Sequence, residues 1–143
     1  MGRPALRGRS DYRAWCPIAT RWHDNDAYGH VNNVVYYSWF DTAVNAWLME
    51  VGLLDLEHSD PVCIVVETGC RYASSVAFPQ KIEVGFAVAK LGTSSVTYHL
   101  GVFVEGAGSA AAEGHFTHVC VDRASQRPVP LPENWRTILA RLT

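Results

Sequence analysis

The sequence lacks the motifs that mark several common classes of enzyme. It contains neither GxxxxGK[ST] nor GxGxxG, which argues against the standard nucleotide sites, and no GxSxG, which argues against a serine-hydrolase nucleophile elbow. No apolar run is long enough to span a membrane. The net charge of −2 gives no overall attraction to nucleic acid or to an anionic membrane surface. We therefore expect a cytoplasmic protein with no nucleic-acid partner and no membrane partner.

Cysteine is present but is not spaced as in a metal site. The four cysteines are Cys16, Cys63, Cys70 and Cys120. They form no CxxC pair and no zinc spacing, and a domain of this size does not need disulfides. We expect reduced, mostly buried thiols, no metal site and no cofactor.

The composition is that of one globular domain with a sizeable core. Hydrophobic residues make up 48% of the 143 positions and charged residues 18%. The beginning of the chain differs, because Arg3, Arg7, Arg9 and Arg13 are balanced only by Asp11. We expect residues 1–14 to be a flexible basic arm and residues 15–143 to form the domain.

The hydrophobic pattern predicts one long helix and about five strands. Residues 34–51 have a single narrow polar stripe, which predicts a largely buried helix capped by Asn32 or Asn33 and ended near Gly52. Strands are predicted at 16–23, 62–72, 81–90, 96–104 and 111–122, and a short helix at 133–141. A break in alternation near Gly114 suggests a bulge. The fold class is α+β, an antiparallel sheet wrapped around one helix.

The stretch TRWHDNDAYGHVNN, residues 20–33, places acids and histidines directly before the predicted helix. Backbone N–H groups at a helix start can stabilise the oxyanion that forms when a carbonyl is attacked. A nearby carboxylate can attack that carbonyl itself or can take a proton from water. A thioester suits this equipment, since its thiol leaving group has a pKa near ~8.5 and departs as thiolate.

Two metal-binding interpretations of the same stretch fit less well. Asp24-Asn25-Asp26 resembles the start of a calcium loop, but Tyr28 and Val35 stand where oxygen ligands belong. The two histidines and two acids of residues 23–30 could in principle bind a transition metal, but no HExxH-like spacing supports this. A helix cap without chemistry remains the plainest alternative.

The stretch continues as VVYYSWFDTA and resembles the opening of the 4-hydroxybenzoyl-CoA thioesterase-like family, whose members have the hotdog fold. Ten positions agree with the family pattern: Arg21, Trp22, Asp24, Asp26, Gly29, His30, Val31, Asn32, Asn33 and Tyr37. Weaker similarities continue to about residue 140, including Arg71-Tyr72, although Ser75 stands where the family usually has proline.

The resemblance implies a hotdog fold, a homodimer or homotetramer, and active sites at the dimer interface. It implies that Asp26 is the catalytic carboxylate, acting as nucleophile or as general base. Backbone N–H groups from Asn32 to Val34 would form the oxyanion hole. His30 and Asn33 would line the thioester pocket, and Gly29 would meet a backbone need.

The function that follows is an acyl-CoA thioesterase, with acyl-carrier-protein thioesters as possible substrates. The phosphates of coenzyme A favour arginine or lysine near a pocket mouth, and Lys90, Arg71 and Arg123 are the candidates. The alternative is a non-catalytic module of the same fold that binds acyl-CoA or an acyl carrier. A hotdog dehydratase is a weaker option, since it would need a different arrangement of histidine and acid.

Overall fold

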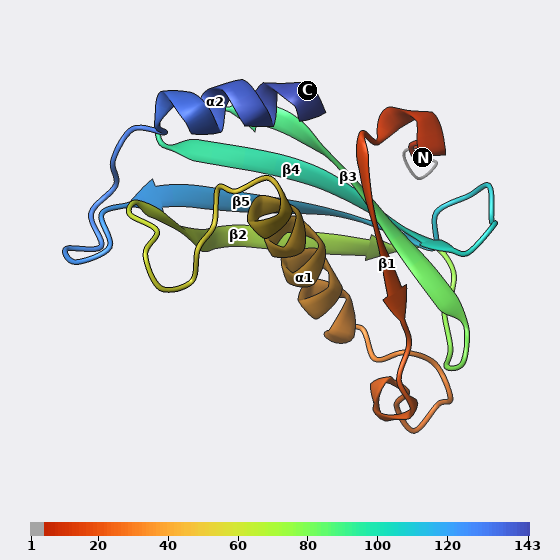
Figure 1. The fold of residues 1–143 in the computed structure, drawn as a ribbon. Coiled ribbons are helices and arrows are strands. Elements are labelled where there is room, and N and C mark those ends of the chain that lie inside the picture. Colours follow the sequence, from red (N-terminus) through yellow and green to blue (C-terminus); the bar gives the residue numbers. More distant parts are fainter. Residues whose placement is uncertain (1–4) are drawn as a thin grey trace.

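The computed structural model describes residues 5–143, in which a five-stranded antiparallel sheet curves around one long helix (Figure 1). The sheet has the strand order β1-β3-β4-β5-β2. The elements are β1 Ala14–Ala19, α1 Val35–Glu50, β2 Val62–Tyr72, β3 Lys81–Leu91, β4 Ser95–Val104, β5 Ala112–Val121 and α2 Glu133–Leu139. Three short 3-10 turns, η1 Arg9–Asp11, η2 Trp22–Asp24 and η3 Ala140–Leu142, complete the chain. This confirms the predicted α+β hotdog architecture.

Helix α1 supplies the centre of the core. Its buried side chains follow helical spacing and are Tyr36, Trp39, Phe40, Ala43, Val44 and Leu48. They pack against the inward residues of β3, β4 and β5, such as Val84, Leu100 and Phe116. The opposite side of the helix, including Met49, is exposed. The buried face of α1 is therefore narrower in this single chain than expected from the sequence, in which only a narrow stripe of the helix is polar. No helix among the described residues is long and apolar enough to cross a membrane.

The first strand is shorter than predicted. It ends at Ala19, and residues Trp22–Asp24 form a 3-10 turn instead of continuing to position 23. The Asp24 carboxylate closes this turn by accepting the Arg21 backbone N–H at 2.8 Å. An acid that bonds the backbone of the residue three positions earlier competes directly with a sheet ladder.

The bulge expected near Gly114 is not there. Gly114 pairs in regular register with Cys70 and Leu100, and the register shifts lie at Val65/Glu67 and Val88/Lys90. A side chain at position 114 would overlap the ring of Phe40 from α1. The glycine thus reflects close helix–sheet packing and not a ladder defect.

The beginning of the chain lies over the face of the sheet turned away from α1. Positions 1–4 of the expected basic arm are outside the described residues. Tyr12 is 4% exposed and forms a small second core with Phe103 and Ala110. The Arg9 guanidinium stacks on Phe103 at 4.7 Å and pairs with Glu83 at 3.0 Å. From Arg9 onward, this segment contributes to packing.

Candidate active site

Two acids, Asp24 at the end of η2 and Asp26 in the loop that leads to α1, lie in different environments. Asp24 is 1% exposed, and both of its oxygens are occupied by Arg21, through the backbone N–H at 2.8 Å and the guanidinium at 2.7 and 2.9 Å. Its backbone carbonyl accepts the Asn32 N–H at 2.9 Å. Asp24 therefore joins the two ends of the loop, as expected for a structural turn residue.

Asp26 is half-exposed and only partly bonded. Its Oδ1 accepts the Tyr28 N–H at 2.8 Å, while its Oδ2 accepts no hydrogen bond from the described residues. Its backbone bonds to both sides of the loop, to the His30 carbonyl at 2.9 Å and from the Gly29 N–H at 3.0 Å. Gly29 has φ +81°, a backbone conformation that favours glycine, and this confirms that the residue is required by the backbone. The loop thus fixes Asp26 and leaves one carboxylate oxygen available.

The predicted cap of α1 by Asn32 or Asn33 is not formed: the N-cap position is Val34, without a side-chain cap, and Asn32 instead closes the turn that leads into the helix. Asn32 Oδ1 accepts the Val34 N–H at 3.0 Å, and the Asn32 carbonyl accepts the Val35 N–H at 3.0 Å. The Asn32 N–H is taken by the Asp24 carbonyl. Within the described chain, the Asn33 N–H has no acceptor. Of the three predicted oxyanion donors from Asn32 to Val34, only the Asn33 N–H is free.

A hollow of about 310 Å³ opens beside this helix start. It is lined by Val31, Asn33, Tyr36, Tyr72, Ala73, Ser74 and Ser75. Tyr72, the last residue of β2, donates its hydroxyl to the Asn33 carbonyl at 2.7 Å. Burial is the main cause that raises the pKa of Tyr72 well above its ordinary value, so the hydroxyl keeps its proton. The sequence offered only one signal for Tyr72, its place in the Arg71-Tyr72 pair.

Large apolar side chains next to the loop lie open to solvent. Trp22 is 80% exposed, Tyr28 is 87% exposed and Val34 is 63% exposed. On the edge strand β2, Val65 and Val66 are exposed as well. Exposed apolar side chains beside an unpaired strand edge are typical of an interaction surface.

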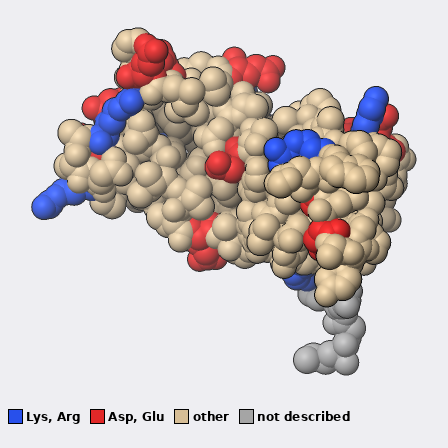
Figure 2. All heavy atoms as spheres, turned by 90° about the horizontal axis from the view of Figure 1, so that it is seen from below, with Lys and Arg blue, Asp and Glu red and all other residues tan. Residues whose placement is uncertain are grey.

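The three cations predicted for coenzyme A lie apart from one another. Arg123 donates its guanidinium to the carbonyls of Leu56 and Ser59, both at 2.9 Å, and so anchors the loop before β2. Lys90 is exposed at the end of β3, in register with Thr97. Arg71 pairs with Glu113 at 2.9 Å. On the face drawn in Figure 2, cationic and anionic groups are interspersed without a broad patch of one sign.

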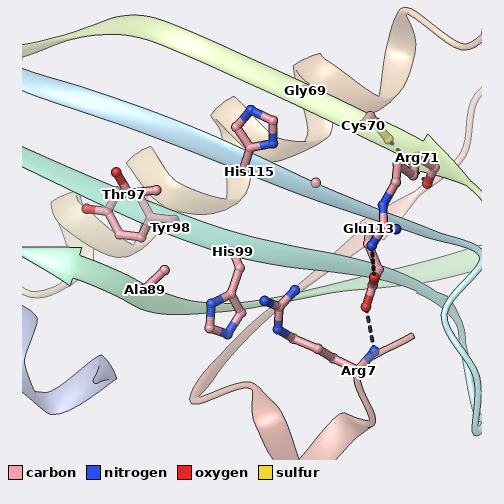
Figure 3. Close-up of a pocket in the computed structure, with 11 residues that line it drawn as sticks. Arg7, Gly69, Cys70, Arg71, Ala89, Thr97, Tyr98, His99, Glu113 and His115 are labelled. Carbon is pink, nitrogen blue, oxygen red and sulfur yellow. Dashed lines mark hydrogen bonds and ion pairs between the residues drawn. The ribbon is translucent and has the colours of Figure 1, made fainter. Parts of the chain in front are cut away.

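A second hollow, of about 510 Å³, lies on the sheet face turned away from α1 (Figure 3). Arg7, Arg71, His99, Glu113 and His115 line it, but it offers no free carboxylate of the Asp26 kind. Glu113 is 3% exposed and accepts the Arg7 backbone N–H at 2.6 Å and the Arg71 guanidinium at 2.9 Å. The loop of residues 24–34 is therefore the stronger candidate for carbonyl chemistry.

Comparisons with known proteins agree with this choice of chemistry. The family model described as the thioesterase-like superfamily matches residues 20–141. The PA5185 protein of Pseudomonas aeruginosa is 53% identical, with 95% of each chain covered and a TM-score of 0.92. The PA2801 protein of the same organism is 31% identical, with 90% of this chain and 98% of that chain covered and a TM-score of 0.83.

A more distant relative was solved as a complex with coenzyme A and zinc. It is a thioesterase of Thermus thermophilus, 26% identical, with 92% of this chain and 93% of that chain covered and a TM-score of 0.75. The comparison with curated proteins gave no match.

Proposed function

The chain belongs to the thioesterase-like superfamily and is a thioester hydrolase, and on that premise we propose that it hydrolyses acyl-CoA with Asp26 as the catalytic carboxylate. One observation carries this proposal. In the loop of residues 24–34 the Asp26 Oδ2 and the Asn33 N–H have no partner among the described residues, whereas the Asp24 carboxylate and the N–H groups of Asn32 and Val34 are bonded. An attacking group and an oxyanion donor are the two parts that thioester cleavage needs.

The proposed chemistry begins with the substrate carbonyl at the start of α1. The Asn33 N–H and the positive end of the helix dipole stabilise the negative charge that develops on the carbonyl oxygen. Asp26 either attacks the carbonyl carbon, forming a mixed anhydride that water then cleaves, or removes a proton from an attacking water. In both routes the C–S bond breaks and the thiol leaves as thiolate, with no need for a strong general acid.

The remaining parts of the loop hold these two groups in place. Asp24 fixes the Asn32 N–H, Gly29 supplies the positive φ that the turn requires, and the Asn32 side chain accepts the Val34 N–H. His30 and Asn33 are proposed to line the thioester pocket, together with the hollow that contains Tyr36 and Tyr72. These contacts hold the Asp26 carboxylate and the Asn33 N–H in fixed positions. A displacement of either group of about 1 Å would be expected to lower the reaction rate.

We propose further that the working form is a homodimer or a larger homo-oligomer. The support comes from the exposed apolar residues Trp22, Tyr28 and Val34 beside the loop and from the exposed edge strand β2. Self-association is the usual way to protect such an edge. Lys90, Arg71 and Arg123 remain predictions for the phosphates of coenzyme A, and a neighbouring subunit can add further cations.

The test is thiol release from a panel of short, long and aromatic acyl-CoAs, comparing wild type with Asp26→Asn. Asparagine can still accept the Tyr28 N–H but cannot attack or take a proton, so we expect a loss of about 10²–10⁴-fold in kcat with little change in Tm. The matched control is Asp122→Asn, whose carboxylate also accepts backbone N–H groups in the turn after β5 and should be dispensable.

Full activity in Asp26→Asn would overturn the assignment of the catalytic residue. Tight acyl-CoA binding by wild type without any thiol release would favour the non-catalytic binding module instead. Release from an acyl-carrier-protein thioester, but from no acyl-CoA, would replace the substrate and keep the site.

A further inference from the structure

Two of the four cysteines are direct partners across neighbouring strands. In the ladder between β2 and β5, Cys63 is in register with Cys120. The other two have different neighbours, since Cys70 pairs with Gly114 and Cys16 with Val84. The ladder thus places one pair of thiols side by side and leaves two single thiols elsewhere.

The backbone bonds of Cys120 define the kind of strand pair. Its N–H donates to the Ser94 carbonyl at 2.7 Å and its carbonyl accepts the Val129 N–H at 2.9 Å. Since both backbone groups point toward the β4 side, none is left for β2, and Cys63 and Cys120 form a non-hydrogen-bonded pair. In such pairs the Cα atoms are about 4.5 Å apart and the side chains are closest. That spacing is at the lower end of the ~4.4–6.8 Å range seen for disulfides.

The two side chains lie on the same face of the sheet and close together. Cys120 is 0% exposed and belongs to the main core, and the half-buried Cys63 packs against that core. Burial is the main cause that raises the pKa of the Cys63 thiol, and the neighbouring Cys120 raises it further. Burial also raises the pKa of the Cys120 thiol, and the contact with Cys63 opposes part of that rise. Both thiols are therefore protonated and adjacent.

We propose that Cys63 and Cys120 form a redox modification site, at which hydrogen peroxide converts the two thiols into a cross-strand disulfide. The Cys63 sulfur attacks a peroxide oxygen, the O–O bond breaks, and a sulfenic acid and one water form. The Cys120 sulfur then attacks the Cys63 sulfur, the S–O bond breaks and a second water leaves. The two thiols lose two electrons and two protons in all, and the peroxide is reduced to water.

The bond would tie the edge strand to the sheet. β2 is held to the sheet on one side only, by β5, and its last residue is Tyr72, which contacts the Asn33 carbonyl. A link at Cys63 closes a long loop of chain and restricts the unfolded state, so oxidation should raise the Tm by about 5 °C or more. The proposal does not rest on the hydrolase reaction.

The test treats the folded full chain with hydrogen peroxide over a pH series and follows intact mass, free thiols and non-reducing peptide maps. We expect the mass to fall by that of two hydrogen atoms and a peptide map that links position 63 to position 120. Because the reacting species is the thiolate, the rate should rise with pH. The double variant Cys16→Ser/Cys70→Ser, which keeps only the proposed pair, should form the bond and show the higher Tm.

Two results would overturn the proposal. One is that Cys16 or Cys70 in wild type becomes oxidised while Cys63 and Cys120 stay reduced up to the highest pH at which the protein remains folded. The other is a disulfide that joins two chains or involves Cys16 or Cys70. If the double variant does not fold, the wild-type peptide map decides alone, and Cys63→Ser serves as the variant that must not lose the two hydrogen atoms.

Discussion

The carboxylates of Asp26 and Glu113 show what distinguishes the candidate active site from a structural site. Asp26 is half-exposed, is held by the backbone of its own loop, and has one oxygen without a partner among the described residues. Glu113 is almost fully buried and is bonded on both sides, by the Arg7 N–H and by the Arg71 guanidinium (Figure 3). The hollow beside Glu113 is larger than the hollow beside the start of α1, at about 510 Å³ against 310 Å³.

The two carboxylates differ most clearly in bonding state, and it is this difference, not cavity size or the number of charges, that makes Asp26 the candidate. A carboxylate with both oxygens occupied lowers the free energy of the fold and is unavailable to a substrate. A carboxylate that is fixed by one oxygen and open at the other can react without first breaking a protein contact. Asp24 and Asp26 repeat the same contrast within one short loop.

After Asp26→Asn, the largest effect on activity is expected from Gly29→Ala, which changes the loop that holds Asp26. Gly29 has φ +81° and open space around its Cβ position, so alanine adds backbone strain of about 1–2 kcal/mol without a clash. Relief of that strain would displace the Asp26 carboxylate, and we expect kcat to fall by about 10²-fold in an acyl-CoA assay.

Gly106→Ala is a closely matched control for this change. Gly106 has φ +80° and is likewise open, but it lies in the turn after β4. Denaturant unfolding should show a similar loss of stability in both variants, and the assay should show a loss of activity only in Gly29→Ala. Equal activities would mean that the loop does not need its geometry for the reaction.

For Glu113 the expected pattern is the opposite: a substitution should lower stability and leave activity nearly unchanged. Glu113→Gln removes the charge that Arg71 and the Arg7 N–H share, and we expect a loss of about 1–3 kcal/mol in the free energy of unfolding. The exposed Glu67, which pairs with His115 at 3.0 Å, is the control, and Glu67→Gln should change stability by no more than about 0.5 kcal/mol. A kcat more than a few-fold below wild type in Glu113→Gln would contradict the structural role.

Tyr72→Phe tests whether the oxyanion donor itself is held in place. The Tyr72 hydroxyl donates to the Asn33 carbonyl at 2.7 Å, and without it residue 33 is less well fixed. We expect kcat to fall by about 10-fold, near 1.4 kcal/mol in barrier, with KM changed less than kcat. If KM rises and kcat is unchanged, Tyr72 contributes to binding and not to the position of Asn33.

Local patterns were sufficient for most of the fold. The strand predicted at residues 62–72 coincides with the observed β2, although the register shift at Val65/Glu67 interrupts its alternation, and the helical spacing of 34–51 gives α1 to within one residue at each end. The turn that the Asn32 side chain closes before α1 and the positive φ of Gly29 also follow from local chemistry. These features depend on residues a few positions apart, which a sequence displays directly.

The features that the sequence did not reveal depend on contacts between distant segments. Gly114 suggests a bulge by itself, but the Phe40 ring and the Gly69 carbonyl, which leave no room for a side chain there, explain the glycine. Arg71 and Arg123 have the charge that a phosphate needs, but Glu113 and the carbonyls near Leu56 occupy them in this chain. Sequence can therefore identify the polar residues, while their bonding state depends on tertiary structure.

Acid should destabilise the sheet face around Glu113 through His99, and this effect is the smallest of those predicted. Burial beneath Tyr12, and next the charge of Arg7, lower the pKa of His99, which Asp11 and Glu113 only partly oppose. His115 lines the same hollow. A histidine with a lowered pKa in the fold takes up a proton more readily when unfolded, so stability falls as the pH drops below about 6.5. His99→Gln removes this proton uptake.

Thermal unfolding from pH 7.5 to pH 5 measures the difference. The Tm of wild type should fall more steeply with decreasing pH than that of His99→Gln. Identical slopes of Tm against pH in wild type and His99→Gln would show that protonation of His99 does not cause the loss of stability in acid.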